Sequence, residues 1–125
     1  MGKHVQWTTY KGMRILVVNG AGLREPDLIA AYEEFKQELL KDRTGPSVLI
    51  DLSNTTLSTK AHDKAKEVAA ATKAEGIPDG PCAVVGLSTL ARAVAQLLQR
   101  SAYFTDSVDK GKEWLLKQDH KVLRP

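Results

Sequence analysis

The first twenty residues carry a pattern of polar and apolar positions that predicts a β-hairpin. Residues 4–10, HVQWTTY, are rich in β-branched and aromatic side chains that alternate with polar ones, as in a strand with one solvated face. Lys11-Gly12 interrupts this run, and residues 14–18, RILVV, are almost continuously apolar, which is typical of a more buried strand. We therefore predict two paired strands, the second nearer the centre of the sheet.

Beyond the hairpin, four segments have apolar residues at helical spacing. Short, continuously apolar runs lie between these segments. The first stripe follows Pro26, which the first turn of a helix tolerates. The last segment is predicted to bury Val108, Trp114 and Leu115. The first predicted helix begins near Pro26, and the second spans about 60–75. The third begins at Ser88 or Thr89, and the fourth follows a cap at Asp106 or Ser107. The predicted strands between these helices are 47–52, 82–87 and 103–104.

Strands that alternate with helices across short loops are typical of an α/β domain. We predict a single domain over residues 1–125, with a mixed, mostly parallel sheet of five strands and four helices. Only the first strand is expected to be antiparallel. The polar residues 120–125 are predicted to form a frayed tail.

The composition is typical of a globular protein, and its net charge bears on the class of partner. The 125 residues are 42% hydrophobic and 26% charged, close to globular averages, which excludes disordered and fibrous classes. The 18 Lys and Arg against 15 Asp and Glu leave a net charge of +3. Because acidic residues are interspersed among the basic ones, this surplus is too small to indicate a specific nucleic-acid partner.

The single cysteine and the short apolar runs indicate a cytoplasmic protein. Cys82 has no second cysteine for an internal disulfide, and it begins an apolar strand, so we expect a buried, unreactive thiol. Residues 1–14 lack the apolar core of a secretion signal. No apolar stretch approaches the roughly 20 residues that span a bilayer, so we predict no transmembrane insertion.

Motifs for cofactors, metals and catalysis are weak in this chain. Gly20-Ala21-Gly22 follows a strand, but a dinucleotide motif needs Gly or Ala where Glu25 stands, and that carboxylate would repel a diphosphate. The three histidines show no metal-ligand spacing with Cys82. We predict no cofactor, no metal and no catalytic residue. A small enzyme that binds an anion at the strand-to-helix turn 86–89 remains an alternative.

A cluster of hydroxyl side chains follows the strand at 47–52. It stands at the carboxyl end of a central strand and before a helix, where open α/β sheets place functional loops. A phosphate added there would meet a helix N-terminus, but the same hydroxyls would also stabilise a turn and cap the helix. The candidate phospho-acceptor or partner-docking residues are Ser53, Thr55, Thr56, Ser58 and Thr59.

The helix after this loop is rich in alanine and edged with lysine. Its small side chains would let it pack close to its own sheet or present a flat, basic-edged face to a protein partner. It lacks the large apolar residues that an interfacial membrane helix buries. Lys60 and Lys64 are the candidate docking residues.

Two sequence patterns and the order of elements carry a family resemblance. The strand at 48–53 reads V-L-I-D-L-S, and residues 104–115 read F-x-D-S-x-x-x-G-x-x-W-L. This pattern resembles SpoIIAA-like proteins of the STAS superfamily, particularly the small bacterial STAS-like proteins grouped with CRAL-TRIO lipid-exchange domains. The resemblance implies a right-handed β-α superhelix and a non-enzymatic regulatory role in which the loop and the following helix dock a protein partner.

The resemblance also ranks the hydroxyl residues. Family members that act as phosphoswitches carry an Asp-Ser-Ser/Thr-Gly-like stretch, and the matching place here is Leu57-Ser58-Thr59-Lys60, without the Asp and the Gly. Ser58 and Thr59 are thus the nearest phospho-acceptor candidates.

The expected function is a cytoplasmic regulatory or protein-interaction module, of the anti-sigma-factor-antagonist kind. A binder of a small apolar or lipid-like ligand is an alternative, and a homodimer is left open. Ligand binding needs an apolar cavity of about 300 Å³ or more. We expect little spare volume of this kind in 125 residues.

Overall fold

The computed structural model describes residues 4–55, 58–87 and 102–123. Strands and helices alternate along these residues as the hydrophobic pattern predicts. The elements are β1 (Val5–Tyr10), β2 (Met13–Asn19), α1 (Glu25–Asp42), β3 (Ser47–Asp51), α2 (Thr59–Ala74), β4 (Cys82–Val85), β5 (Tyr103–Thr105) and α4 (Val108–Leu123).

The five strands form one mixed sheet in the order β1-β2-β3-β4-β5. β1 and β2 are antiparallel and pair Val5 with Val18, and the turn between them holds Lys11 and Gly12 at positive φ. β2, β3, β4 and β5 are mutually parallel. The predicted α/β class and mostly parallel five-stranded sheet are confirmed, including the single antiparallel strand.

The described residues contain three helices, where the sequence predicts four in the whole chain. The predicted helix that opens at Ser88 or Thr89 lies outside the described residues. α4 continues to Leu123, so the backbone of residues 120–123 is helical where a frayed tail is predicted. Within the described ranges, no helix combines the length and the apolar character that crossing a membrane requires.

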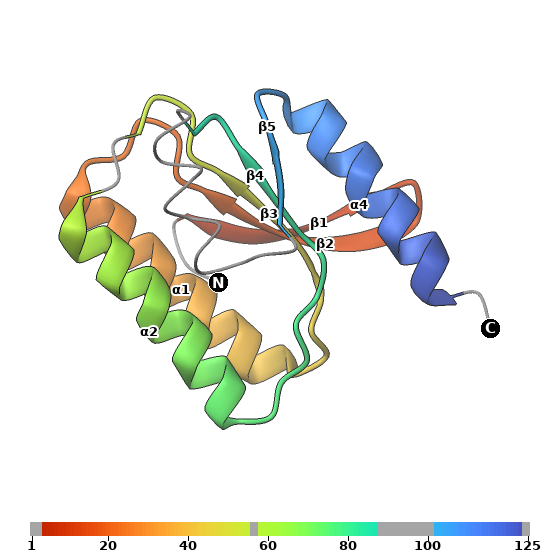
Figure 1. The fold of residues 1–125 in the computed structure, drawn as a ribbon, viewed down its shortest axis with the longest axis horizontal. Coiled ribbons are helices and arrows are strands. Elements are labelled where there is room, and N and C mark those ends of the chain that lie inside the picture. Colours follow the sequence, from red (N-terminus) through yellow and green to blue (C-terminus); the bar gives the residue numbers. More distant parts are fainter. Residues whose placement is uncertain (1–3, 56–57, 88–101, 124–125) are drawn as a thin grey trace.

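The sheet lies between two helical layers (Figure 1). α1 and α2 run side by side over one face, and α4 packs on β3, β4 and β5 from the other. Side chains alternate accordingly along β2, where Leu16 and Val18 belong to the core under α1 and α2, and Ile15 and Val17 to the core under α4. The carboxyl ends of β3 and β4 both lead into the predicted site loops.

Among the side chains of α4 that the structure describes, Leu115, rather than Trp114, is the fully buried anchor. Leu115 is fully buried in the core that contains Leu49, whereas Trp114 is half-buried and stacks on Tyr103 with ring centroids 5.2 Å apart. Gly111 brings the helix close to the sheet, because a Cβ there would lie 2.8 Å from Leu49 Cδ1. Leu115, four residues after Gly111 on the same side of the helix, is therefore close enough to the strands to be fully buried.

Candidate functional site

The hydroxyl loop after β3 is held by internal hydrogen bonds. The Asp51 carboxylate accepts from the backbone N–H of Ser53 at 3.0 Å and from its hydroxyl at 2.7 Å. Thr55 donates its hydroxyl to the carbonyl of Gly20 at 2.6 Å, which ties the loop to the turn after β2. Ser53 and Thr55 therefore stabilise the turn. Thr56 lies outside the described residues.

Ser58 and Thr59 differ in what their hydroxyls do. Ser58 is the N-cap of α2, in extended conformation, and its side chain accepts from the backbone N–H of Ala61 at 3.1 Å. Thr59 is the first helical residue, is exposed, and forms no side-chain hydrogen bond with the described part of the chain. Of these two phospho-acceptor candidates, Thr59 is thus the accessible one.

The turn after β4 packs directly on the hydroxyl loop. Gly86 has a φ of +85°, and its N–H donates to the carbonyl of Thr105 at 2.8 Å. A Cβ at Gly86 would meet the Cα of Ser53 at 2.6 Å, so the two predicted site regions touch. Ser88 and Thr89, which would supply the hydroxyls of an anion site, lie outside the described residues.

The two candidate docking lysines have different surroundings. Lys60 is exposed on the first turn of α2. Lys64 instead reaches α1, where its Nζ lies 2.5 Å from a Glu33 oxygen, and it also contacts Glu67 at 2.7 Å. Lys36 of α1 pairs with the same two carboxylates. The Lys64 side chain, 13% exposed, therefore joins α2 to α1.

This ion-pair network predicts an acid-sensitive helix contact. Hydrogen bonds from Lys64, then Gln37 and Lys36, lower the pKa of Glu33 to about 2 from its usual 4.5. A carboxyl whose pKa is depressed in the folded protein stabilises the fold above the unfolded-state pKa, and this contribution is lost as the pH falls. We expect stability to decrease between about pH 5 and pH 2, and the decrease to be smaller in Glu33→Gln.

Urea denaturation across this pH range, at low and high salt, measures the effect. Because Glu33 is 41% exposed, solvent and salt screen the interaction, and 1 M salt should shrink the difference between the two proteins. Glu25→Gln, in the first turn of α1 and outside this network, is the control. Identical pH profiles for wild type and Glu33→Gln would contradict the role of the network.

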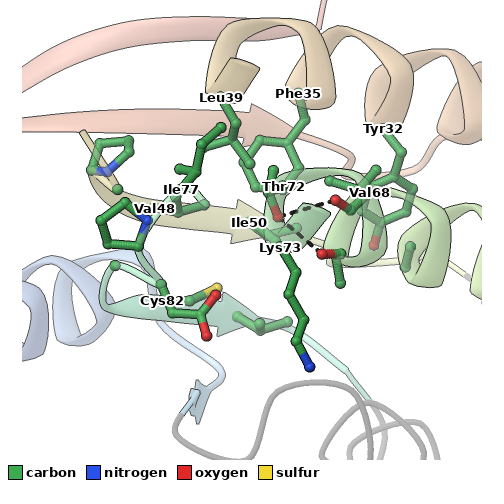
Figure 2. Close-up of a pocket in the computed structure, with 18 of the residues that line it drawn as sticks. Tyr32, Phe35, Leu39, Val48, Ile50, Val68, Thr72, Lys73, Ile77 and Cys82 are labelled. Carbon is green, nitrogen blue, oxygen red and sulfur yellow. Dashed lines mark hydrogen bonds between the residues drawn. The ribbon is translucent and has the colours of Figure 1, made fainter. Parts of the chain in front are cut away.

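A cavity of about 780 Å³ lies between α1, α2 and the face of the sheet that they cover. Figure 2 shows Tyr32, Phe35 and Leu39 projecting into it from α1, opposite Val68 and Thr72 of α2. The sequence predicts little spare volume, whereas the described residues line this space. Strand residues complete the lining, among them Val48, Ile50, Cys82 and Val84.

Most polar groups of this cavity are either bonded or at its edge. The Thr72 hydroxyl donates to the carbonyls of Val68 and Ala69 at 3.2 and 3.1 Å. Lys73 and Asp79 also line the cavity, but both are exposed. The interior is thus mainly apolar, and its charged groups mark where it reaches the surface.

Cys82 lines this cavity from the first position of β4. Its side chain is buried, with a relative exposure of 4%, and forms no disulfide. The prediction of a buried thiol is confirmed. Its placement beside a cavity was not predictable from the apolar run alone.

Comparison with known proteins adds no family assignment. No family model matches the chain, and no curated protein matches its sequence. Within the described residues, no three His, Cys, Asp or Glu side chains gather in a way that could hold a metal ion. The geometry of the loop and the cavity is therefore the guide to function.

Proposed function

We propose that this chain is a non-enzymatic, STAS-type binding module that holds a small apolar or lipid-like ligand between α1, α2 and the sheet. The observation that carries the proposal is the cavity of about 780 Å³, which lies within the range of small-molecule sites. The sequence resemblance to the group that includes CRAL-TRIO domains supports the same class of ligand.

The lining favours an apolar ligand over a highly charged one. Phe35, Ile50 and Val84 offer surface that gains free energy when a ligand removes it from water. Thr72 is already bonded to its own helix and has little need of a polar partner. A charged group placed deep in this lining would lose its hydration without compensation.

A cavity-filling substitution tests the proposal. The uncharged fluorescent probe N-phenyl-1-naphthylamine should bind the wild type with saturable fluorescence enhancement. Ala65→Phe places a ring in the cavity and should weaken binding at least tenfold, because the ring takes the volume that the probe needs.

The matched control is Ala70→Phe, which adds the same ring on the exposed side of α2, outside the cavity lining. It should bind the probe like the wild type. Thermal melting would verify that both variants fold. Failure of the wild type to bind, or equal binding by both variants, would refute a ligand site in this cavity.

A regulatory role through a protein partner is the second candidate, and the exposure of Thr59 favours it. A phosphate on Thr59 would lie in the first turn of α2, beside Lys60, where the helix dipole stabilises negative charge. The role as an anti-sigma-factor antagonist, the protein partner and a homodimer all belong to this proposal. The cytoplasmic location and the lack of catalysis rest on the sequence arguments.

Two substitutions separate regulation from capping. Thr59→Glu should change the recovery of native partner proteins from a cytoplasmic extract while leaving the melting temperature unchanged. Ser58→Ala removes the cap, so it should cost about 0.5–2 kcal/mol of stability and capture the same partners. If Thr59→Glu captures the same partners in the same amounts, the regulatory role of this residue is wrong.

A further inference from the structure

The Tyr32 side chain is buried in the wall of the cavity. Its side chain is 5% exposed, and it forms no side-chain hydrogen bond with the described residues. Figure 2 shows the ring reaching from α1 toward the residues of α2 and the sheet that line the same space. Among the described residues, no side-chain nitrogen or oxygen is both fully buried and without a partner, so the Tyr32 hydroxyl keeps access to the open space beside it. A ligand that accepts its hydrogen bond would take the place of water there.

The hydroxyl is a donor at neutral pH. Burial, and to a smaller extent the nearby Cys82 thiol, raise the pKa of Tyr32 above its ordinary value. The phenol therefore keeps its proton and offers one O–H for donation. Cys82 itself lines the cavity from β4.

The register of the helices keeps the charged rim away from Tyr32. Ion pairs join α1 and α2 at an offset of 31 positions, so Tyr32 is level with residue 63 of α2. Lys73 is ten residues further along, about 15 Å at the rise of an α-helix. His62, one position from this level, also lines the cavity and forms no hydrogen bond with Tyr32. A ligand anion at the hydroxyl would thus lie far from the Lys73 ammonium.

Resting on the proposed function, we infer that the ligand carries an uncharged hydrogen-bond acceptor, a ketone, ester or hydroxyl oxygen, within an apolar body, and that Tyr32 donates to it. The cavity lining contacts the apolar body of the ligand, and the hydroxyl selects ligands that carry a hydrogen-bond acceptor. A carboxylate at the same point would have to give up its hydration in a mainly apolar lining, which disfavours fatty-acid anions.

Displacement of N-phenyl-1-naphthylamine by three ligands of equal chain length tests the inference: octane, 2-octanone and octanoate. Tyr32→Phe keeps the ring and removes only the hydroxyl. It should weaken the binding of 2-octanone about threefold to tenfold, which is the range for one hydrogen bond. The affinity for octane should stay within twofold of the wild-type value. Comparing each ligand between the two proteins cancels differences in ligand solubility. Tyr103→Phe, on the opposite face of the sheet, is the control and should change none of the three.

The outcomes distinguish this inference from the proposed function. If octane and 2-octanone bind the wild type and neither is weakened in Tyr32→Phe, the cavity binds ligands but the role of the hydroxyl is wrong. If octanoate binds the wild type most tightly and loses the most affinity in Tyr32→Phe, the hydroxyl recognises an anionic head group, and the inference of an uncharged acceptor is wrong. If neither the probe nor any ligand binds the wild type, the proposed function itself fails and the inference fails with it.

Folding of the variant is checked independently. Because the hydroxyl has no described partner, Tyr32→Phe should unfold at the same urea midpoint as the wild type or at a higher one. A clearly lower midpoint would show that the hydroxyl has a structural bond within the protein, which would overturn its assignment to a ligand.

Discussion

Replacing Leu115 with alanine should lower the free energy of unfolding by about 2–5 kcal/mol, the range for truncating a buried leucine. Leu115 is 0% exposed and lies in the core formed by residues such as Ile15, Leu49 and Val85. The substitution removes apolar contacts and leaves a void that packed strands refill only in part. This loss is a large fraction of the stability of a domain of this size.

Urea denaturation followed by circular dichroism measures the change. Leu116→Ala is the matched control, because it removes the same atoms from the next position of α4, where the side chain is only partly buried. Its cost should be clearly smaller. Equal costs for the two variants, or an unchanged midpoint for Leu115→Ala, would contradict the packing of α4.

The arrangement of strands and helices could be predicted because local patterns and turn residues agree. The Lys11-Gly12 turn separates an alternating strand from a continuous one, and the structure pairs them as β1 and β2. Ser58 likewise fixes the start of α2, because its side chain caps the helix. Such signals are local, and they need no knowledge of the tertiary packing.

The choice between neighbouring residues of α4 could not be predicted in this way. Helical periodicity places Trp114 and Leu115 about 100° apart, and both are apolar. The orientation is decided by where the helix touches the sheet, at Gly111 against Leu49. That contact joins residues far apart in the sequence, so helical periodicity alone does not tell which of the two is fully buried.

The cavity was missed for a related reason. The alanine-rich α2 suggested close packing on the sheet, but Lys64 and Glu67 form ion pairs that hold the helix against α1. Small residues such as Ala65 then leave space under the helix, because the helix does not move in to fill it. An apolar sequence predicts burial of a face, whereas the distance between two buried faces depends on all the elements that support them.

Replacing Gly86 with alanine is the second substitution with a large expected effect. At a φ of +85° an alanine costs about 1–2 kcal/mol through its own backbone conformation. The added Cβ would also lie 2.6 Å from Ser53 Cα and 2.8 Å from Ser53 N, a collision with backbone that no rotamer change relieves. Overpacking of this kind typically costs a further 1–3 kcal/mol. The expected total is about 2–5 kcal/mol in the free energy of unfolding.

Gly12→Ala isolates the collision from the backbone strain. Gly12 has a φ of +84°, nearly the same as Gly86, but a Cβ there meets nothing within 4 Å. Urea denaturation should therefore give about 1–2 kcal/mol for Gly12→Ala and a larger loss for Gly86→Ala. Because the collision displaces Ser53, the difference between the two variants measures how tightly the turn after β4 supports the hydroxyl loop. Equal losses would mean that the loop moves aside freely, and that the contact between these two regions contributes no stability.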